Sequence, residues 1–453
     1  MSTSLVIGTN VDITFDGVEF RDHFFVAPTG TTFGGAVYVV STETADIPIS
    51  LTFNDCLFDG NNADIGAGIG AQATRTAGEG NFAIIEVDNS TFTNNVGLAG
   101  AGMRLFGSTG ATVTDSLFED NEVSSVGAGL QIFSNQGNGE FNFSGNTWRN
   151  NVSQSQGGAV SASGDEAGSH TLTFSGDLFE GNDALGVNTA GQGAGGAILH
   201  GGAGELNINN CTFDSNTALA SLPDSLSFGS AISVINGDNE QTALNIVGST
   251  FINNEADLGT AINIQGSAVN GAVTVISANN TYEGNSGLSA ALRAATNTTL
   301  VSTSDMFIGN SSLGSGSAFA ILNAQGEVTA GGFFDNAAGD FGAVLSGADG
   351  QVLLVNSVLA DNTSENAAAA VASVFGEMTV LNSTLANNGA FDELGNRLGA
   401  PQAAIFMDPD EIGGQDNRII NSIVWNDAAD VSTLPDIQAQ QGSNVSIEFS
   451  LIR

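Results

Sequence analysis

A short motif recurs along the chain and constrains the fold more than any other feature. Each copy has an aromatic or aliphatic lead residue followed three positions later by Asn. The lead residues are Phe58, Phe92, Phe118, Trp148, Phe179, Phe213, Phe251, Tyr282, Phe307, Phe333, Leu359, Leu385 and Ile423. The Asn residues are Asn61, Asn95, Asn121, Asn151, Asn182, Asn216, Asn254, Asn285, Asn310, Asn336, Asn362, Asn388 and Asn426. A motif that returns every 20–50 residues predicts a stacked repeat architecture.

A degenerate copy precedes these thirteen, with Phe20 as its lead residue and His23 in the Asn column. From position 20 to position 423 there are 403 residues and thirteen intervals, or about 31 residues per copy, and individual intervals run from 25 to 38. The motif is constant and the connections vary in length, which is typical of loops on a rigid scaffold.

The segments around the motif read as strands. Residues 82–88 alternate apolar and polar side chains at period two, and short β-rich runs bounded by Gly, Asn and Asp recur along the chain. About 31 residues suit one coil of a parallel β-solenoid, in which three short strands lie on those of the previous coil. The fold class is therefore all-β, a single solenoid of about 14 coils whose lead aromatics stack in an internal column.

The Asn column has physical properties that suit such a stack. Asn tolerates the left-handed backbone conformation of a tight turn, and its side chain carries both a donor and an acceptor, so identical turns can hydrogen-bond from coil to coil. A second motif of small residues and an aliphatic, as in Gly-Gly-Ala-Val at 157–160, lets the wall pass close to a filled interior.

The combination of Phe-x-x-Asn with Gly-Gly-Ala-aliphatic resembles the repeat of chlamydial polymorphic outer membrane proteins. It is also similar to the wider group of secreted bacterial parallel β-helix proteins with the pectate-lyase-like fold. The resemblance covers about residues 13–449 and implies a right-handed β-helix on a cell surface. The chain departs from the pattern where the second motif erodes, at 289–292 and 368–371, and we expect no C-terminal membrane barrel.

We expect one domain over residues 1–453. Residues 1–12 form an initial strand, 13–418 the repeats, and 419–453 the last coil and a C-terminal strand. The sequence shows neither a secretory signal nor an 18-residue apolar run.

The charge balance restricts the partners. The chain has no Lys, 8 Arg and 48 acidic residues, for a net charge of −40. Nucleic-acid binding needs the opposite sign, and anionic membrane surfaces are disfavoured for the same reason. The acidity suits salty water, divalent cations or cationic partners, or else a surface that merely favours solubility.

Cysteine and histidine suggest no site. Cys56 and Cys211 are five coils apart, too far for a disulfide, so we expect two free, packed thiols. His23, His170 and His200 have no spacing typical of a metal pair or a catalytic triad, which favours structural roles.

The sharpest acidic cluster is Asp408, Asp410, Glu411 and Asp416, in a loop before the last coil. Oxygen-rich loops bind Ca²⁺, which makes Ca²⁺ the one candidate cofactor. The EF-hand pattern fails here because Ile stands at its fifth and twelfth positions, so an ordinary acidic loop is the competing interpretation.

Two functions remain open. The first is a non-catalytic, extracellular or cell-surface structural or adhesin-like protein. Its partner would be a polysaccharide or cell-surface ligand, or another copy stacked end to end, because both ends read as bare strands. The alternative is a polysaccharide-active enzyme, a hydrolase or a lyase. A hydrolase needs two carboxylates at a defined separation, and acids in the two free positions of the motif could supply them by stacking, or could simply be solvated. The test between the two functions is whether acids from neighbouring coils converge in a groove.

Overall fold

The structure is a computed structural model, and it describes residues 12–24, 32–41, 49–73, 83–107, 109–134, 137–164, 168–187, 192–222, 224–365, 368–389, 403–408, 416–425, 437–439, 444–448 and 450–452. Within these ranges all regular structure is β and there is no helix. The chain divides into two compact units, an N-terminal unit of residues 1–245 and 269–271 and a C-terminal unit of residues 246–268 and 272–453.

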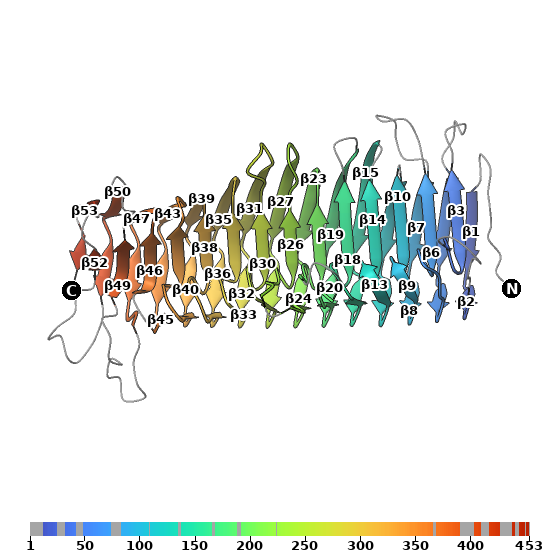
Figure 1. Ribbon diagram of the computed structural model, residues 1–453, viewed down its shortest axis with the longest axis horizontal. Coiled ribbons are helices and arrows are strands. Elements are labelled where there is room, and N and C mark those ends of the chain that lie inside the picture. The colour runs from blue at the N-terminus through green and yellow to red at the C-terminus, as the bar shows by residue number, and fades with distance from the viewer. Residues whose placement is uncertain are drawn as a thin grey trace. The chain divides into compact units, whose positions relative to one another are not determined.

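In both units, successive copies of the repeat lie on one another as coils of a parallel β-solenoid (Figure 1). A typical coil contributes one strand to each of four parallel sheets, which we number in chain order. The first sheet has strands of mostly five to eight residues, the second holds the three-residue strands with the lead residues, the third has short strands, and the fourth closes the coil. Parallel β-solenoid architecture, the aromatic column and the Asn ladder are all confirmed.

The strands of the N-terminal unit fall into these four sheets. The first sheet contains β1 (Asp12–Asp16), β4 (Ile49–Asn54), β7 (Ala83–Asp88), β11 (Thr109–Thr114), β15 (Gly137–Ser144), β19 (Gly168–Ser175) and β23 (Gly204–Asn209). The second contains β2 (Glu19–Arg21), β5 (Leu57–Asp59), β8 (Thr91–Thr93), β12 (Leu117–Glu119), β16 (Thr147–Arg149), β20 (Leu178–Glu180) and β24 (Thr212–Asp214). The third contains β9 (Val96–Ala99), β13 (Glu122–Val126), β17 (Val152–Ser153), β21 (Asp183–Ala184) and β25 (Thr217–Ala218). The fourth contains β3 (Val37–Ser41), β6 (Ile69–Ala73), β10 (Met103–Gly107), β14 (Leu130–Ser134), β18 (Val160–Gly164), β22 (Ile198–Gly201) and β26 (Ile232–Ile235).

The C-terminal unit repeats the arrangement, and the division between the units falls within β27 (Gln241–Val247). Its first sheet contains β31 (Ala272–Ala278), β35 (Thr298–Thr303), β39 (Gln325–Thr329), β43 (Gln351–Val355), β47 (Glu377–Leu381), β50 (Asp416–Ile420) and β53 (Asn444–Glu448). The second contains β28 (Thr250–Ile252), β32 (Thr281–Glu283), β36 (Met306–Ile308), β40 (Gly332–Phe334), β44 (Val358–Ala360), β48 (Thr384–Ala386), β51 (Ile423–Trp425) and β54 (Leu451–Ile452). The third contains β29 (Glu255–Ala256), β33 (Ser286–Gly287), β37 (Ser311–Ser312), β41 (Ala337–Ala338) and β45 (Thr363–Ser364). The fourth contains β30 (Ile262–Gln265), β34 (Leu292–Ala295), β38 (Phe319–Leu322), β42 (Val344–Gly347), β46 (Ala368–Val374), β49 (Ala403–Asp408) and β52 (Ile437–Ala439).

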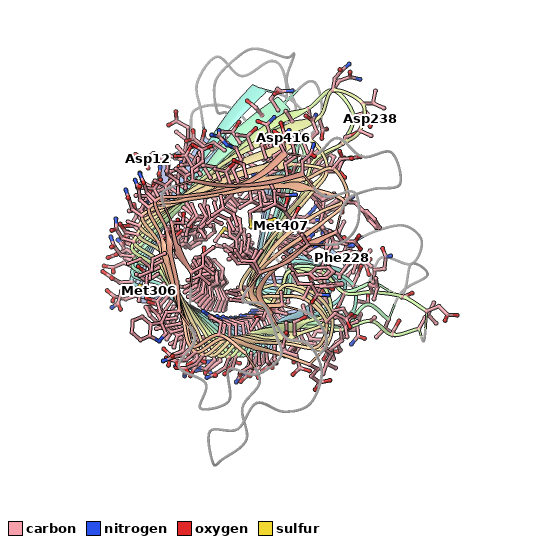
Figure 2. All side chains as sticks on the ribbon, turned by 90° about the vertical axis from the view of Figure 1, so that its left-hand side faces the viewer. Asp12, Phe228, Asp238, Met306, Met407 and Asp416 are labelled. Carbon is pink, nitrogen blue, oxygen red and sulfur yellow. The ribbon has the colours of Figure 1, made fainter. Side chains whose placement is uncertain are left out.

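The lead residues stack inside each unit as predicted. Phe58, Phe92 and Phe118 are fully buried, and their ring centroids are 4.5 and 4.6 Å apart with nearly parallel planes. In the C-terminal unit the rings of Tyr282 and Phe307 lie 4.7 Å apart. Offset or parallel stacking at this spacing adds to the burial of large apolar side chains. In an end-on view Met407 lies inside the wall of the C-terminal unit and Asp416 lies outside it (Figure 2).

The Asn residues form a buried ladder. Asn121 Oδ1 accepts bonds from the backbone N–H and from Nδ2–H of Asn95 at 3.2 and 2.9 Å, and Asn95 Nδ2 also donates to the carbonyl of Phe58 at 3.0 Å. The same pattern joins Asn310 and Asn336 in the C-terminal unit. His23 is in this column, as predicted, because its backbone N–H donates to Asn61 Oδ1 at 3.1 Å. Each rung satisfies backbone groups that would otherwise be buried without partners.

The expectation that the ladder Asn takes the left-handed conformation is wrong, because the residue before it does so. Asn94, Asp120 and Asn150 have φ of 51–54°, whereas the ladder residues are not among those with positive φ. A second left-handed residue, such as Asn89 or Asp115, precedes each lead strand from β2 to β51 by two positions. Two one-residue corners therefore bracket the lead strand, which explains the Asn, Asp and Gly on both sides of it.

The last copy of the motif is shifted by one residue from the prediction. Leu385 pairs with Val424, which is fully buried, whereas Ile423 is 41% exposed. Since side chains alternate between faces, a one-residue shift exchanges inside and outside. Val424 is therefore the lead residue, and Asn426 falls one position before the ladder; residue 426 itself lies outside the described residues.

A second column runs two residues before the lead residues, and it contains both cysteines. Cys56 and Cys211 are buried and free, as predicted. The backbone N–H of Cys56 donates to Ser90 Oγ at 2.9 Å, and Ser90 N–H donates in turn to Ser116 Oγ at 3.0 Å. The thiols thus occupy positions where most coils use a hydroxyl or an amide to bridge to the next coil.

Candidate functional site

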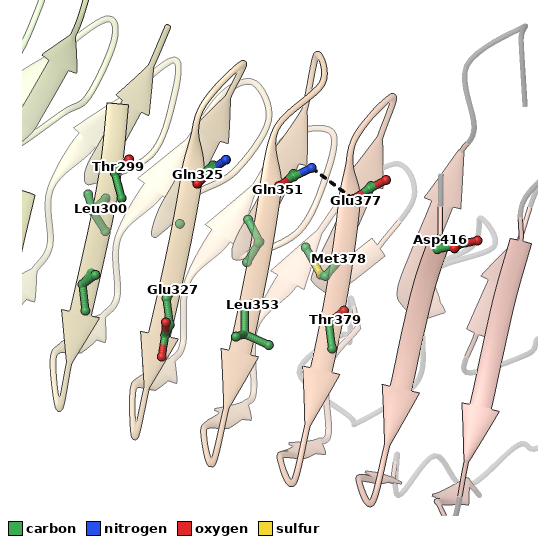
Figure 3. A pocket seen from close by; sticks show the side chains of 13 residues that line it. Thr299, Leu300, Gln325, Glu327, Gln351, Leu353, Glu377, Met378, Thr379 and Asp416 are labelled. Carbon is green, nitrogen blue, oxygen red and sulfur yellow. Dashed lines mark hydrogen bonds between the residues drawn. The ribbon is translucent and has the colours of Figure 1, made fainter. Parts of the chain in front are cut away.

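A groove of about 350 Å³ crosses the outer face of the first sheet in the C-terminal unit (Figure 3). It extends over β35, β39, β43, β47 and β50. Its outward side chains are two amides, three carboxylates, two hydroxyls and two aliphatics, namely Gln325, Gln351, Glu327, Glu377, Asp416, Thr299, Thr379, Val301 and Leu353. The period-two alternation of these strands points this set outward, because Leu300, Val328 and Leu354 face the core.

Parallel register arranges the groove in two rows. One row runs through Gln325, Gln351 and Glu377 on β39, β43 and β47, and a second runs through Glu327, Leu353 and Thr379 on the same strands. Gln351 Nε2 donates to Glu377 Oε2 at 3.2 Å, which fixes the amide within its row (Figure 3). Neighbouring strands are about 4.8 Å apart, so polar groups recur at that interval along the groove.

Two carboxylates of the groove are neighbours. Thr379 on β47 pairs with Arg418 on β50, so two residues earlier Glu377 is opposite Asp416. The hydrogen bond from Met378 N–H to Asn417 Oδ1, at 2.9 Å, keeps the same register. These two acids are 39 residues apart in the sequence. No sequence motif links them, and the strand register alone brings them together.

The structure only partly locates the predicted Ca²⁺ loop. Asp408 ends β49 in the fourth sheet and Asp416 begins β50 in the first, while Asp410 and Glu411 lie outside the described residues. Among the residues that are described, no three His, Cys, Asp or Glu side chains gather as a metal site. The Ca²⁺ site stays a prediction.

The acids in the free positions of the motif behave as a solvated surface column with some ion pairs. Arg149 Nε contacts Glu180 at 2.8 Å and Arg149 Nη1 contacts Glu119 at 3.3 Å, both on neighbouring coils. Arg21 contacts Asp59 in the same way at 2.8 Å. Exposed pairs of this kind contribute little to stability, and arginine separates the acids instead of letting them converge.

A buried histidine pair in the N-terminal unit was missed by sequence reasoning. His170 on β19 and His200 on β22 are buried, with their Nε2 atoms 3.0 Å apart and both Nδ1 atoms without a partner. Burial lowers the pKa of His170 to about 4, and burial, together with the charge of neighbouring His170, lowers the pKa of His200 well below its usual value. The alternation of side chains along a strand could have predicted that His170 points inward, because it is two residues before the inward Leu172.

Two buried carboxylates occupy the column of the cysteines. Asp177 accepts from the N–H groups of Asn146 and Ser175 at 3.0 and 2.9 Å. Burial nevertheless raises the pKa of Asp177 to about 6. Asp305 accepts from Asn280 N–H at 2.8 Å and from Ser302 Oγ at 2.7 Å, and burial raises its pKa as well. These groups are enclosed and bonded within the wall, so they act as parts of the scaffold.

Comparisons with known proteins add little to this picture. No protein-family model matches the chain, and no curated protein matches its sequence, so the chlamydial resemblance rests on the motifs alone. A solved structure that matches is the A-module of the mannuronan C-5 epimerase AlgE6 from Azotobacter vinelandii, at 8% identity and a TM-score of 0.27, over 92% of this chain and 90% of that one. At that similarity the match carries no argument about activity. No described residue belongs to a helix long and apolar enough to span a membrane.

Proposed function

We propose that this protein is a non-catalytic, extracellular, adhesin-like scaffold that binds an extended polysaccharide across the outer face of the first sheet. The observation that carries the proposal is the groove over β35–β50, where amides, hydroxyls and carboxylates line the wall beside Val301 and Leu353. Sugar hydroxyls both donate and accept, and amide and carboxylate side chains supply matching partners. The apolar side chains give the less polar faces of sugar rings a surface to pack on.

The charge of the groove selects the class of polysaccharide. Glu327, Glu377 and Asp416 line it, and Arg418 beside them is held by Glu448 at 3.1 Å. A polyanion would be repelled by these carboxylates and by the net charge of −40. The ligand is therefore a neutral or amino-bearing polymer, and its repeat is read by the recurring rows of polar groups.

Binding can be measured by affinity electrophoresis against a neutral β-glucan, partly deacetylated chitin and polygalacturonate. We expect retardation by one of the first two and none by the third. The double variant E327A/E377A should weaken binding about tenfold or more, since each charge-assisted hydrogen bond contributes about 1.5–3 kcal/mol. Glu283→Ala, on the outer face of β32 in the second sheet, is a matched control. Retardation by polygalacturonate, or unchanged binding in the double variant, would contradict the proposal.

A second function, glycoside hydrolysis, is favoured by the register that sets Glu377 opposite Asp416. Hydrolases use two carboxylates about 5–9.5 Å apart, one as acid and the other as nucleophile or base, and adjacent strands can provide that separation. A reducing-end assay on the polymer that binds decides between the two functions. New reducing ends that disappear in E377Q, with binding retained, would replace the non-catalytic proposal.

A further inference from the structure

The arginines of this acidic chain fall into two groups. Arg21, Arg149 and Arg418 each contact a carboxylate, at 2.8–3.3 Å. Within the described part of the chain, Arg104 and Arg293 contact no carboxylate, and each bonds to an amide oxygen instead. With 48 acidic residues available, a partly buried guanidinium without a carboxylate partner calls for an explanation.

Arg293 has unmet hydrogen-bonding capacity. It lies on the outer face of β34, where Nη1 donates to Asn263 Oδ1 on the neighbouring strand β30 at 2.7 Å. Its Nε is buried without a partner, and so is Nδ2 of Asn263. Burial lowers the pKa of Arg293, because the charged guanidinium loses hydration that its one hydrogen bond to Asn263 does not fully replace. Two buried donors on adjacent strands therefore lack an acceptor.

An apolar groove of about 330 Å³ begins at Arg293 and follows the outer face of the fourth sheet. Its floor is formed by Leu322, Gly347 and Val374, which occupy one row on β38, β42 and β46. Leu288 and Phe341, from the segments that lead from the third sheet to the fourth, form a side. A volume of this size suits a small ligand.

A glycine keeps the floor of the groove low. Ala320, beside Arg293 in the register of the sheet, is buried in a cluster with Leu345 against which Leu322 and Phe341 pack, and Gly347 lies in the next outward row. A Cβ at Gly347 would come within 3.0 Å of Leu322 Cδ2. A bulkier residue at Gly347 would fill the space over the floor. With glycine there, the apolar groove stays open beside Arg293.

We propose that this groove binds an amphiphilic carboxylate, with the carboxylate on Arg293 and the hydrocarbon body over Leu322, Gly347 and Val374. Charge complementarity places the polar end of the ligand, because a carboxylate supplies the negative charge and the acceptor that the Arg293 guanidinium lacks. The apolar floor sets the other end, because a small hydrophilic anion would leave Leu322 and Val374 uncovered. The site is on the fourth sheet, so it is independent of the polysaccharide groove on the first.

Isothermal titration calorimetry with octanoate, below its micelle concentration, tests the site on the full chain. We expect saturable binding, and weaker binding of octanol, which keeps the chain but lacks the charge. Arg293→Met should weaken octanoate binding by about tenfold to a hundredfold, the loss typical of a hydrogen-bonded charge, and should leave octanol binding unchanged. Arg418→Met is the control, since it removes the same charge from an ion-paired surface position.

A second variant addresses the apolar half of the site. Gly347 has an ordinary strand conformation, so Gly347→Val should fold while its side chain obstructs the floor. It should weaken octanoate and octanol alike, and circular dichroism should show an unchanged β spectrum. The proposal is overturned if octanoate does not bind, if octanol binds as tightly as octanoate, or if Arg293→Met and Arg418→Met have equal effects in a folded protein.

Discussion

The outer face of the fourth sheet carries an arginine in both units, and the two arginines have different surroundings. In the N-terminal unit the guanidinium carbon of Arg104 is 4.9 Å from the centroid of the Phe106 ring, and its Nε donates to Gln131 Oε1 at 2.8 Å. In the C-terminal unit Arg293 keeps one amide contact, its Nε has no partner, and the floor beside it is aliphatic. One arginine is satisfied by its own sheet, and the other is left with unmet donors.

The difference shows which positions of this fold are free to vary. The inner columns of the two units are nearly interchangeable, since the Asn and aromatic residues repeat the same contacts in both. Outward positions on the same strands do not have to repeat such contacts, because the next coil constrains their backbone and not their exposed side chains. Specificity in a solenoid is therefore expected on the outer faces.

The largest expected effect tests whether the interiors are equivalent. Asn182→Ala in one unit and Asn336→Ala in the other each remove an acceptor of two bonds and a donor to a buried carbonyl. Each variant should lose about 3 kcal/mol or more of unfolding free energy, since buried partners are left unsatisfied. Urea denaturation measures both losses. A loss below about 1 kcal/mol in either unit would break the equivalence.

Acid should separate the two units, because the buried histidine pair belongs to the N-terminal unit. An unfolded histidine takes up a proton near pH 6.5, whereas His170 in the fold does so near pH 4. The unfolded state therefore binds more protons between these values, so stability is full above pH 6.5 and falls as the pH drops toward 4. The protection factors of amides in β19 and β22, which correct for the slower intrinsic exchange in acid, should fall across this window, on the order of a few kcal/mol in opening free energy.

The double variant H170L/H200L is the matched control for the acid effect. It removes both titrating groups and keeps an apolar side chain at each inward position. Its protection factors in β19 and β22 should be nearly independent of pH across the same window. A fall in protection equal to that of the parent protein would assign the acid response to other groups.

The buried carboxylates should show the opposite pH dependence in both units. Asp177 has a folded pKa of about 6 against 3.8 for the free group, so the fold favours its protonated form. The stability that protonated Asp177 contributes is fully present below pH 3.8 and is lost as the pH rises through 6. Asp177→Asn should therefore raise stability at pH 7.5 by about 1 kcal/mol and change little at pH 4.

Asp305→Asn provides the equivalent measurement in the C-terminal unit, since burial raises the pKa of Asp305 too. Thermal unfolding at the two pH values gives the comparison. Destabilisation of both variants at pH 7.5 would mean that the charged form is the one that each network holds.

The smallest expected effect concerns the two arginines themselves. Arg293→Met should raise stability by about 0.5 kcal/mol, because it removes a buried charge that has no carboxylate partner. Arg104→Met should lower stability by a similar amount, through the loss of the contact over Phe106 and the bond to Gln131. Thermal unfolding of the pair should show shifts of opposite sign. Equal shifts in unfolding temperature would mean that the two arginines contribute to stability in the same way.

The repeat itself made most of the scaffold predictable. The period of about 31 residues led to stacked coils, and the fixed offset of three residues located the aromatic column and the Asn ladder. Free thiols at Cys56 and Cys211 followed from counting coils. The prediction missed by one residue at Ile423, where the motif is weak and only the pairing of Leu385 with Val424 decides which side chain points inward.

What the sequence by itself determined is the interior, because a column that must repeat in every coil leaves a periodic trace in the chain. What only the tertiary structure decided is which residues meet across coils. His170 meets His200, Glu377 adjoins Asp416, and Arg293 reaches Asn263 without a carboxylate. These pairs are 30 to 39 residues apart, and connections of variable length set that separation. Their proximity depends on strand register and on the direction of each side chain, which no local pattern records.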